Sequence, residues 1–127
     1  MKKKPTTLHL ADLPGGPPKG TLLVELHEIA DHGGKSVLFH DGDRRISLLV
    51  QIRGDKAFIY ENSCPHAGTP LNLFGEKFLT IDGSYLICRT HGAQFTLEEG
   101  RCILGPCKGD YLRPVAFEEK EGALYSA

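Results

Sequence analysis

Two short segments of the chain carry residue types that bind soft transition metals. The first segment contains Cys64 and His66, and the second contains Cys88 and His91. Each segment offers one thiolate sulfur and one imidazole nitrogen, which are good ligands for iron and zinc. The spacings favour two short loops over a helical arrangement. Two such loops brought together would form a site with two sulfur and two nitrogen ligands.

This ligand set fits two kinds of metal site. A tetrahedral zinc ion bound by two Cys and two His is a structural site that stabilises a small fold. The other kind is a [2Fe-2S] cluster that has both Cys on one iron and both His on the other. The four residues alone leave both sites open, and the flanking sequence is needed to choose between them.

Glycine and proline residues flank both ligand pairs in a distinctive pattern. The sequence is Cys-Pro-His-Ala-Gly at residues 64–68, Cys-Arg-Thr-His-Gly-Ala-Gln-Phe at residues 88–95, and Gly-Pro at residues 105–106. This pattern resembles the Rieske iron-sulfur family, and the resemblance is specific from about residue 57 to residue 114. It does not resemble a zinc finger, whose second ligand pair is two His on a helix. The resemblance therefore implies one [2Fe-2S] cluster.

The resemblance also implies which residue holds which iron. Cys64 and Cys88 would bind the inner iron, and His66 and His91 would bind the outer iron. The fold of the family is an antiparallel β-sandwich that carries a small cluster-binding subdomain. In this chain we expect that subdomain at about residues 62–107.

The same resemblance gives roles to residues beside the ligands. Gly68 and Gly92 would let the backbone approach the cluster and donate N–H groups to sulfur, since no side chain stands in the way. Pro106 would cover the cluster from a third loop. Cys102 and Cys107 flank this loop, and three readings of them stay open: ordinary buried thiols, a reversible disulfide, or additional metal ligands.

Four positions depart from the high-potential members of the family. Where those members have a disulfide between the two loops, this chain has Thr69 and Thr90, so no such bridge can form. Where they place a Ser and a Tyr that hydrogen-bond to cluster sulfur, this chain has Ala93 and Phe95. Fewer donors to sulfur lower the reduction potential. The match is therefore to the soluble ferredoxins that serve bacterial oxygenases, and we expect a low-potential cluster.

The elements that would position these loops read as short strands. Runs rich in Val, Ile, Leu, Phe and Tyr alternate with turn signals that contain Gly with Asp or Glu, and no long amphipathic helix is visible. The 15 glycines and 8 prolines fit a chain that turns often. An all-β antiparallel sandwich or barrel is the expected fold class. The predicted strands are residues 22–29, 36–40, 46–52, 57–61, 85–88, 94–97, 114–119 and 123–125.

Composition restricts the size of the domain and the class of partner. At 127 residues with 40% hydrophobic residues, we expect an N-terminal tail and loop at residues 1–20 and one domain at residues 21–127. The net charge of −1 argues against nucleic acid and anionic membranes as partners. No export signal or apolar span is recognised, so we expect a soluble, cytoplasmic and monomeric protein.

The expected function is electron transfer rather than catalysis, because no nucleophile with an adjacent base is recognised in the sequence. The first hypothesis is a ferredoxin that carries single electrons from a flavin-dependent reductase to an oxygenase. The second is a small subunit of a larger reductase, such as a nitrite reductase. The third, from another class, is a zinc-stabilised interaction module.

We predict that replacing His91 by Ala loses the cluster or makes it labile, because the outer iron loses a ligand. Visible absorption and electron paramagnetic resonance spectra of the reduced protein would report the loss. His40 has no cysteine at a ligand spacing, so the His40→Ala variant should keep the wild-type spectrum. An intact spectrum in the His91→Ala variant would show that His91 is not a ligand of the cluster.

Overall fold

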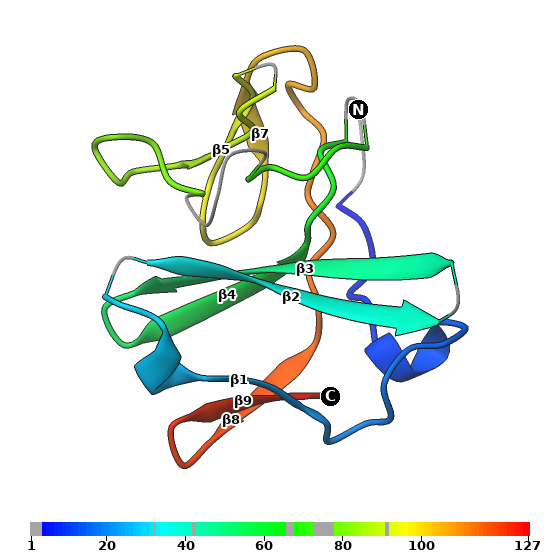
Figure 1. Ribbon diagram of the computed structural model, residues 1–127. Coiled ribbons are helices and arrows are strands. Elements are labelled where there is room, and N and C mark those ends of the chain that lie inside the picture. The colour runs from blue at the N-terminus through cyan, green and yellow to red at the C-terminus, as the bar shows by residue number, and fades with distance from the viewer. Residues whose placement is uncertain (1–3, 32, 42, 66–67, 73–77, 91) are drawn as a thin grey trace.

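The protein is built from three small antiparallel sheets, as the computed structural model shows (Figure 1). Within the described part of the chain there is no α-helix, only the short 3-10 turns η1 (Leu10–Asp12) and η2 (Leu26–Glu28). The all-β prediction is therefore confirmed. No helix among the described residues has the length and apolar character needed to cross a membrane. The structure describes residues 4–31, 33–41, 43–65, 68–72, 78–90 and 92–127.

The central sheet contains β2 (Gly34–Asp41), β3 (Arg44–Arg53) and β4 (Lys56–Glu61), in the order β2-β3-β4. The two hairpins arise because strand-forming runs are separated by the turns that the sequence predicts. The β3–β4 turn contains Gly54 with a φ of 60°, a conformation that glycine adopts without steric cost. The predicted strands at residues 36–40, 46–52 and 57–61 all lie inside these three strands.

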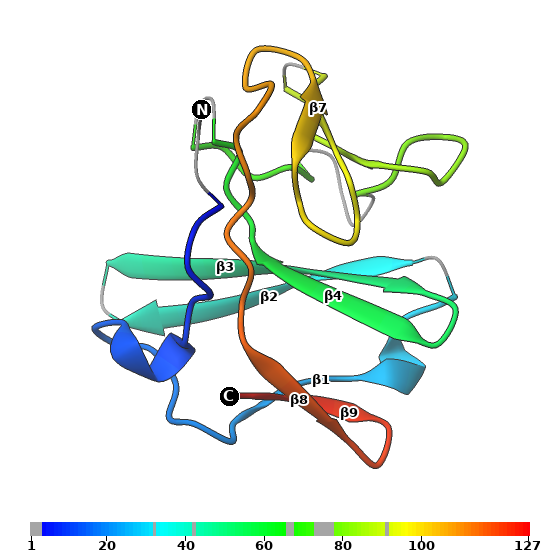
Figure 2. The same cartoon turned by 180° about the vertical axis from the view of Figure 1, so that it is seen from behind.

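The second sheet contains β1 (Leu22–Glu25), β8 (Phe117–Lys120) and β9 (Ala123–Ser126), in the order β1-β9-β8. It lies below the central sheet in Figures 1 and 2, and the two sheets form a sandwich. Strand β1 ends earlier than the predicted run at residues 22–29. Glu25 pairs with Ala123, where β9 begins, so the residues that follow have no partner strand and turn into η2.

Strand β8 also begins later than the run predicted at residues 114–119. Pro114 has no N–H group to give to a ladder, and it makes only an isolated bridge to Tyr60. The neighbouring Val115 makes an isolated bridge to Leu8, and the Leu8 N–H donates to the Pro114 carbonyl at 2.8 Å. Leu8 and Leu10 are both buried, so this part of the N-terminal segment packs on the sandwich. The domain boundary at residues 20 and 21 stays a prediction.

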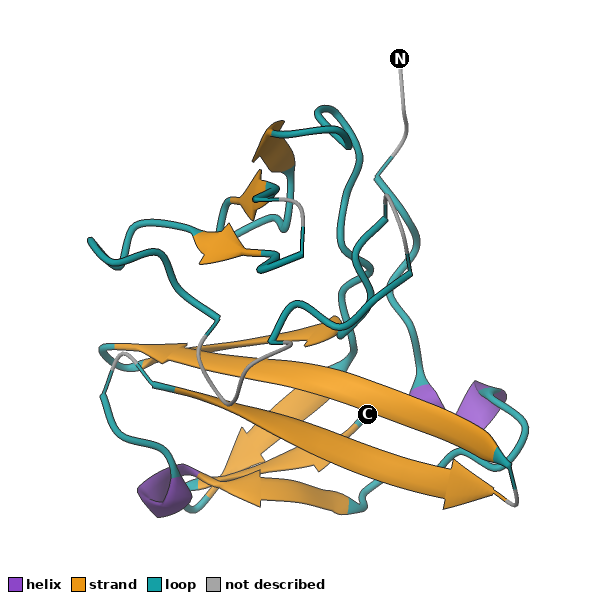
Figure 3. Cartoon of the chain, turned by 45° about the horizontal axis from the view of Figure 1, so that its top comes forward, coloured by secondary structure: helices purple, strands orange, loops and turns teal. Residues whose placement is uncertain are grey.

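The third sheet contains β5 (Leu86–Ile87), β6 (Gln94–Phe95) and β7 (Cys102–Leu104), in the order β5-β6-β7. It lies on the opposite face of the central sheet from β1, β8 and β9 (Figures 1 and 3). The sequence did not predict β7, because three residues beside Gly105 are too few to show an alternation. Strand β6 is shorter than predicted, since the chain turns again at the Thr96–Gly100 hydrogen bond of 2.9 Å. Strand β5 is also shorter than predicted.

Strand β3 separates two hydrophobic cores, because successive side chains of a strand point to opposite faces. Leu48 and Val50 belong to the core between the central and the second sheet. Leu49 belongs to the core between the central and the third sheet, together with Tyr60, its partner on β4. All three leucine and valine side chains have 0% exposure. The central sheet is thus covered on both faces along its middle.

We predict that replacing Leu48 by Ala lowers the free energy of unfolding by about 2–5 kcal/mol, because it leaves a cavity in the sandwich core. Leu38 lies on the neighbouring strand β2 with 43% of its surface exposed. The matched Leu38→Ala variant should therefore change the free energy of unfolding by less than about 0.5 kcal/mol. Urea unfolding of both variants checks this, and equal losses would contradict the described core.

Candidate metal centre

The two predicted ligand loops share one backbone hydrogen-bond pattern. In loop 1 (residues 64–69), the Cys64 N–H donates to the Thr69 carbonyl at 2.8 Å, and the Gly68 N–H donates back to the Cys64 carbonyl at 2.7 Å. In loop 2 (residues 88–93), the Cys88 N–H donates to the Ala93 carbonyl at 2.8 Å. There the N–H of residue 92 donates to the Cys88 carbonyl at 2.9 Å. The backbone N–H and carbonyl of each cysteine are therefore both bonded to the far end of its own loop.

Glycine is required at the same place in both loops. Gly68 has a φ of 72° and Gly92 has a φ of 73°, the left-handed region in which a side chain is strained. A Cβ atom at either position would meet no described atom within 4 Å. The requirement is therefore the backbone conformation that turns the chain back to the cysteine carbonyl, together with any group bound against the loop.

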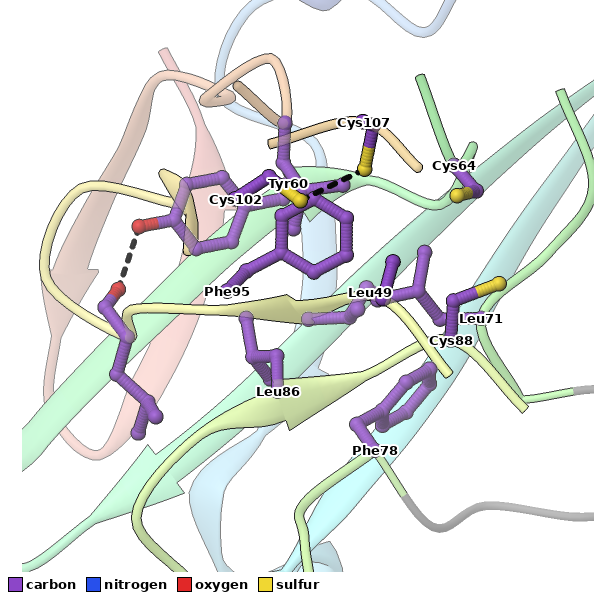
Figure 4. Packing of buried hydrophobic residues seen from close by; sticks show 13 residues of the cluster. Leu49, Tyr60, Cys64, Leu71, Phe78, Leu86, Cys88, Phe95, Cys102 and Cys107 are labelled. Atoms are coloured by element: carbon purple, nitrogen blue, oxygen red, sulfur yellow. Dashed lines mark hydrogen bonds between the residues drawn. The ribbon is translucent and has the colours of Figure 1, made fainter. Parts of the chain in front are cut away.

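Cys64 and Cys88 are brought into one buried cluster at the ends of the two loops. Both residues have 0% exposure and belong to the core beneath the third sheet. Figure 4 shows both side chains at one end of this cluster, next to Leu71. The two segments also contact directly, since the Arg89 N–H of loop 2 donates at 3.2 Å to the carbonyl of Leu71, two residues beyond loop 1. Two sulfur ligands from separate loops can therefore serve one site.

The two predicted imidazole ligands, His66 and His91, lie outside the described residues. Their neighbours are described: Pro65 and Gly68 on one loop, and Thr90 and Gly92 on the other, are all exposed. Each histidine position is therefore bracketed by residues at the surface, while the cysteine of the same loop is buried. The four-ligand assignment stays a prediction.

Asn62 fixes loop 1 to the central sheet, and the sequence analysis did not identify it. It is 5% exposed, and its side-chain oxygen accepts from the Leu71 N–H at 2.9 Å. Its amide nitrogen donates to Asn72 Oδ1 at 2.8 Å and to Ser47 Oγ at 3.2 Å. A polar side chain directly after a predicted strand was the available signal, but its partners are distant in sequence. Asn62 thus holds the chain on both sides of loop 1.

A third loop packs against loop 2. Gly105 has a φ of 101°, and a Cβ there would lie 2.8 Å from the Cα of Ala93, so a side chain at this position would push the loops apart. Pro106, predicted to cover the cluster, is exposed beside it. All four cysteines lie among the described residues, and none of them is in a disulfide. Cys107 Sγ lies 2.8 Å from Cys102 Sγ.

Burial controls the protonation of two side chains in this core. The pKa of the Cys107 thiol is raised, first by burial and then by the neighbouring sulfurs of Cys102 and Cys64. Burial likewise raises the pKa of Tyr60. The Tyr60 hydroxyl donates to the Leu97 carbonyl at 2.5 Å. Tyr60 is therefore a neutral structural donor whose proton is already used within the core.

The described residues fit a [2Fe-2S] cluster. Two buried cysteines in one cluster of the core are the sulfur half of such a ligand set. In addition, Thr69 Oγ1 is buried and has no hydrogen-bond partner among the described residues, although buried hydroxyls are normally paired. Sulfur of a bound cluster would accept this hydrogen bond. Ala93 and Phe95 are completely buried and have no hydroxyl to donate.

Comparison with known families and proteins agrees with this reading. The family model of the Rieske [2Fe-2S] domain matches residues 12–116. A protein of Mycolicibacterium smegmatis, named as a Rieske 2Fe-2S iron-sulfur protein, is 35% identical over 74 residues. These residues make up 58% of this chain but only 12% of that protein. The present chain therefore corresponds to a small part of that relative.

Solved structures share the fold. The ferredoxin of carbazole 1,9a-dioxygenase from Nocardioides aromaticivorans IC177 has a TM-score of 0.67 at 18% identity, covering 87% of this chain and 98% of that chain. A complex of oxygenase and ferredoxin in carbazole 1,9a-dioxygenase has a TM-score of 0.66 at 24% identity, covering 84% and 90%. A protein named as the small subunit of a nitrite reductase (NADPH) has a TM-score of 0.59 at 15% identity, covering 87% and 99%.

We predict that replacing Thr69 by Val lowers the midpoint potential of the bound cluster, because Val keeps the shape but removes the hydroxyl. A hydrogen bond of about 1 kcal/mol corresponds to roughly 40 mV for one electron. The Thr69→Ser variant keeps a hydroxyl and should stay close to wild type. Voltammetry of the three proteins checks this. Equal potentials in the Val variant and wild type would show that Thr69 donates nothing to the cluster.

Proposed function

The chain belongs to the Rieske [2Fe-2S] domain family, and on this premise we propose that it is a low-potential carrier of single electrons. The domain of this family holds one [2Fe-2S] cluster. We assign Cys64 and Cys88 to one iron and His66 and His91 to the other. The observation that supports this assignment is the repeated loop pattern, which brings two buried cysteines together and leaves each histidine position among exposed neighbours.

The protein's own residues would bind the cluster, limit its contact with water and leave one side accessible. When bound, the cluster supplies one-electron oxidation and reduction at its irons. Burial of Cys64 and Cys88 keeps water from the sulfur side. Gly68 and Gly92 hold the two loops in the conformation that closes each loop on the carbonyl of its own cysteine. The exposed neighbours of the histidines suit a surface at which a partner receives or delivers the electron.

The low potential follows from the donors that the core does not offer. Ala93 and Phe95 have no hydroxyl, and the Tyr60 hydroxyl is already bonded to the Leu97 carbonyl. The reduced cluster carries one more negative charge, which hydrogen bonds to sulfur would stabilise. Only Thr69 offers an unpaired hydroxyl among the described buried side chains. A potential near the lower limit of the family's range suits electrons from a flavin rather than from a quinol.

We propose that the electron donor is a flavin-dependent reductase and that the acceptor is an oxygenase, the protein itself being a carrier and not a catalyst. The fold is similar to the ferredoxin of a dioxygenase, and another similar structure is a complex of oxygenase and ferredoxin. We also propose a cytoplasmic monomer, since the assignment of Cys64 and Cys88 to a metal site is a use of cysteine typical of a reducing compartment.

A second function has support of its own. The fold is also similar to a protein named as the small subunit of a nitrite reductase, and it covers 99% of that chain. The alternative is therefore that this chain works as a fixed subunit of a larger reductase. Membership of the Rieske family argues against the zinc-stabilised module.

We predict about two irons and two acid-labile sulfides per chain, and a midpoint potential near −150 mV. Metal and sulfide analysis of anaerobically purified protein, followed by protein-film voltammetry, measures both. Stoichiometric zinc without sulfide would rule out the [2Fe-2S] cluster. A midpoint potential above about +100 mV would contradict the prediction of a low potential.

Affinity purification from the native host separates the two functions. A ferredoxin should be isolated alone and should restore electron flow between a separately purified flavin reductase and an oxygenase. A reductase subunit should instead copurify with a large partner in a constant ratio.

A further inference from the structure

Cys102 and Cys107 place their sulfur atoms against each other outside the proposed ligand set. Cys102 begins strand β7, and Cys107 follows the turn that contains Gly105. The Cys107 S–H donates to Cys102 Sγ, and the two sulfurs are 2.8 Å apart (Figure 4). A disulfide bond measures about 2.05 Å. The two sulfurs are therefore already close to bonding distance.

The backbone around the pair is already ordered for such a bond. The Cys102 N–H donates to the Asp110 carbonyl at 2.8 Å, and the Gly109 N–H donates to the Cys102 carbonyl at 3.0 Å. The Asp110 N–H in turn donates to the Cys107 carbonyl at 2.8 Å. These bonds hold the two cysteines in position in the reduced protein. Forming the bond therefore costs little additional backbone entropy.

The interactions that oxidation would remove are weak. In the reduced protein the Cys102 S–H donates to the Leu104 carbonyl at 3.3 Å, and thiol hydrogen bonds of this kind are weak. Cys102 and Cys107 are only 1% and 2% exposed, but the loop directly over them, residues 104–106, is exposed. Local opening of this surface loop is the expected route by which a reagent reaches a sulfur.

We propose that Cys102 and Cys107 form a second redox site, a dithiol that a small-molecule disulfide of the glutathione type oxidises to an intramolecular disulfide. In the opened loop one cysteine loses its proton, and its thiolate attacks a sulfur of the small disulfide, which breaks that S–S bond, forms a mixed disulfide and releases one small thiol. The second cysteine then attacks the protein sulfur of the mixed disulfide and releases the other small thiol. Two protein S–H bonds are lost, one S–S bond forms, and the two protons end on the two released thiols.

The site differs from the inter-loop bridge of high-potential relatives, whose positions here are Thr69 and Thr90. Its connection to electron transfer is through Cys64, a step that rests on the proposed function. In Figure 4 Cys107 lies between Cys102 and Cys64, and all three belong to the same buried cluster. Closing the disulfide replaces two S–H groups near the Cys64 sulfur by one S–S bond. The midpoint potential of the cluster should therefore differ between the dithiol and the disulfide forms.

The test is to equilibrate the anaerobically purified, cluster-loaded protein in glutathione buffers of increasing oxidised fraction, starting from both the reduced and the oxidised protein. Acid quenching, alkylation of remaining thiols and peptide mass mapping then follow. The expected result is one cross-linked peptide that joins Cys102 to Cys107, lacks two hydrogens and reverts in reduced glutathione. Alkylation of both cysteines in every buffer, or a cross-link that contains Cys64 or Cys88 instead, would overturn the proposal.

The single variants Cys102→Ser and Cys107→Ser provide the matched controls. Each variant leaves one thiol of the pair, so each should accumulate only a glutathione adduct. The midpoint potential of its cluster should not change with the oxidised fraction of glutathione in the way that the wild-type potential does. If either variant does not fold, the peptide map of the wild-type protein still shows whether Cys102 and Cys107 form a disulfide.

The outcomes separate this proposal from the proposed function. A cross-link in a protein that binds no iron rejects the carrier and leaves the dithiol site. A protein that binds the cluster but forms no cross-link rejects the dithiol site and leaves the proposed carrier function. A cross-link that leaves the cluster potential unchanged rejects the connection through Cys64.

Discussion

Burial of both faces of the central sheet is the constraint that places the other layers. Strand β3 alternates between two cores, with Leu48 and Val50 toward one and Leu49 toward the other. One core requires a second sheet below, and the other requires the small third sheet above. Because the third sheet has only short strands, its stability depends on this contact. The loops that carry the cysteines are thereby held over a rigid surface.

The two cysteine loops show how a small protein can build a symmetric site from non-repeated sequence. Each loop closes on its cysteine through a carbonyl five residues later and a glycine between them. The histidine stands at a different position in each loop, at residue 66 and at residue 91, yet the backbone frame around the cysteine is the same. The backbone hydrogen bonds around each cysteine therefore hold the two cysteines in place. Asn62 then ties the first loop to the sheet, so that the loops keep their separation.

Local sequence was sufficient for part of this structure. The hairpins of the central sheet were predicted because alternating apolar runs stood between Gly-containing turns. The end of β1 at Glu25 and the short strand β7 depend on partners far along the chain, and a local pattern does not report where a partner strand begins. The cysteine loops were found by residue type and spacing. The role of Asn62 was not found, since its partners Ser47 and Asn72 are known only from the fold, and the two histidines are still assigned from sequence alone.

The pairing of β1 with β9 joins segments near the two ends of the chain: Leu22 lies opposite Tyr125. The hairpins of the central sheet need only short loops to close, whereas this pairing must close a loop that contains both cysteine segments. Contacts of such large sequence separation form late and slow the folding of a domain. We therefore expect the metal-binding half to order before the sandwich is complete. The cysteine loops lie on the opposite face of the central sheet from this pairing, so the last strand completes the sandwich without closing over the site.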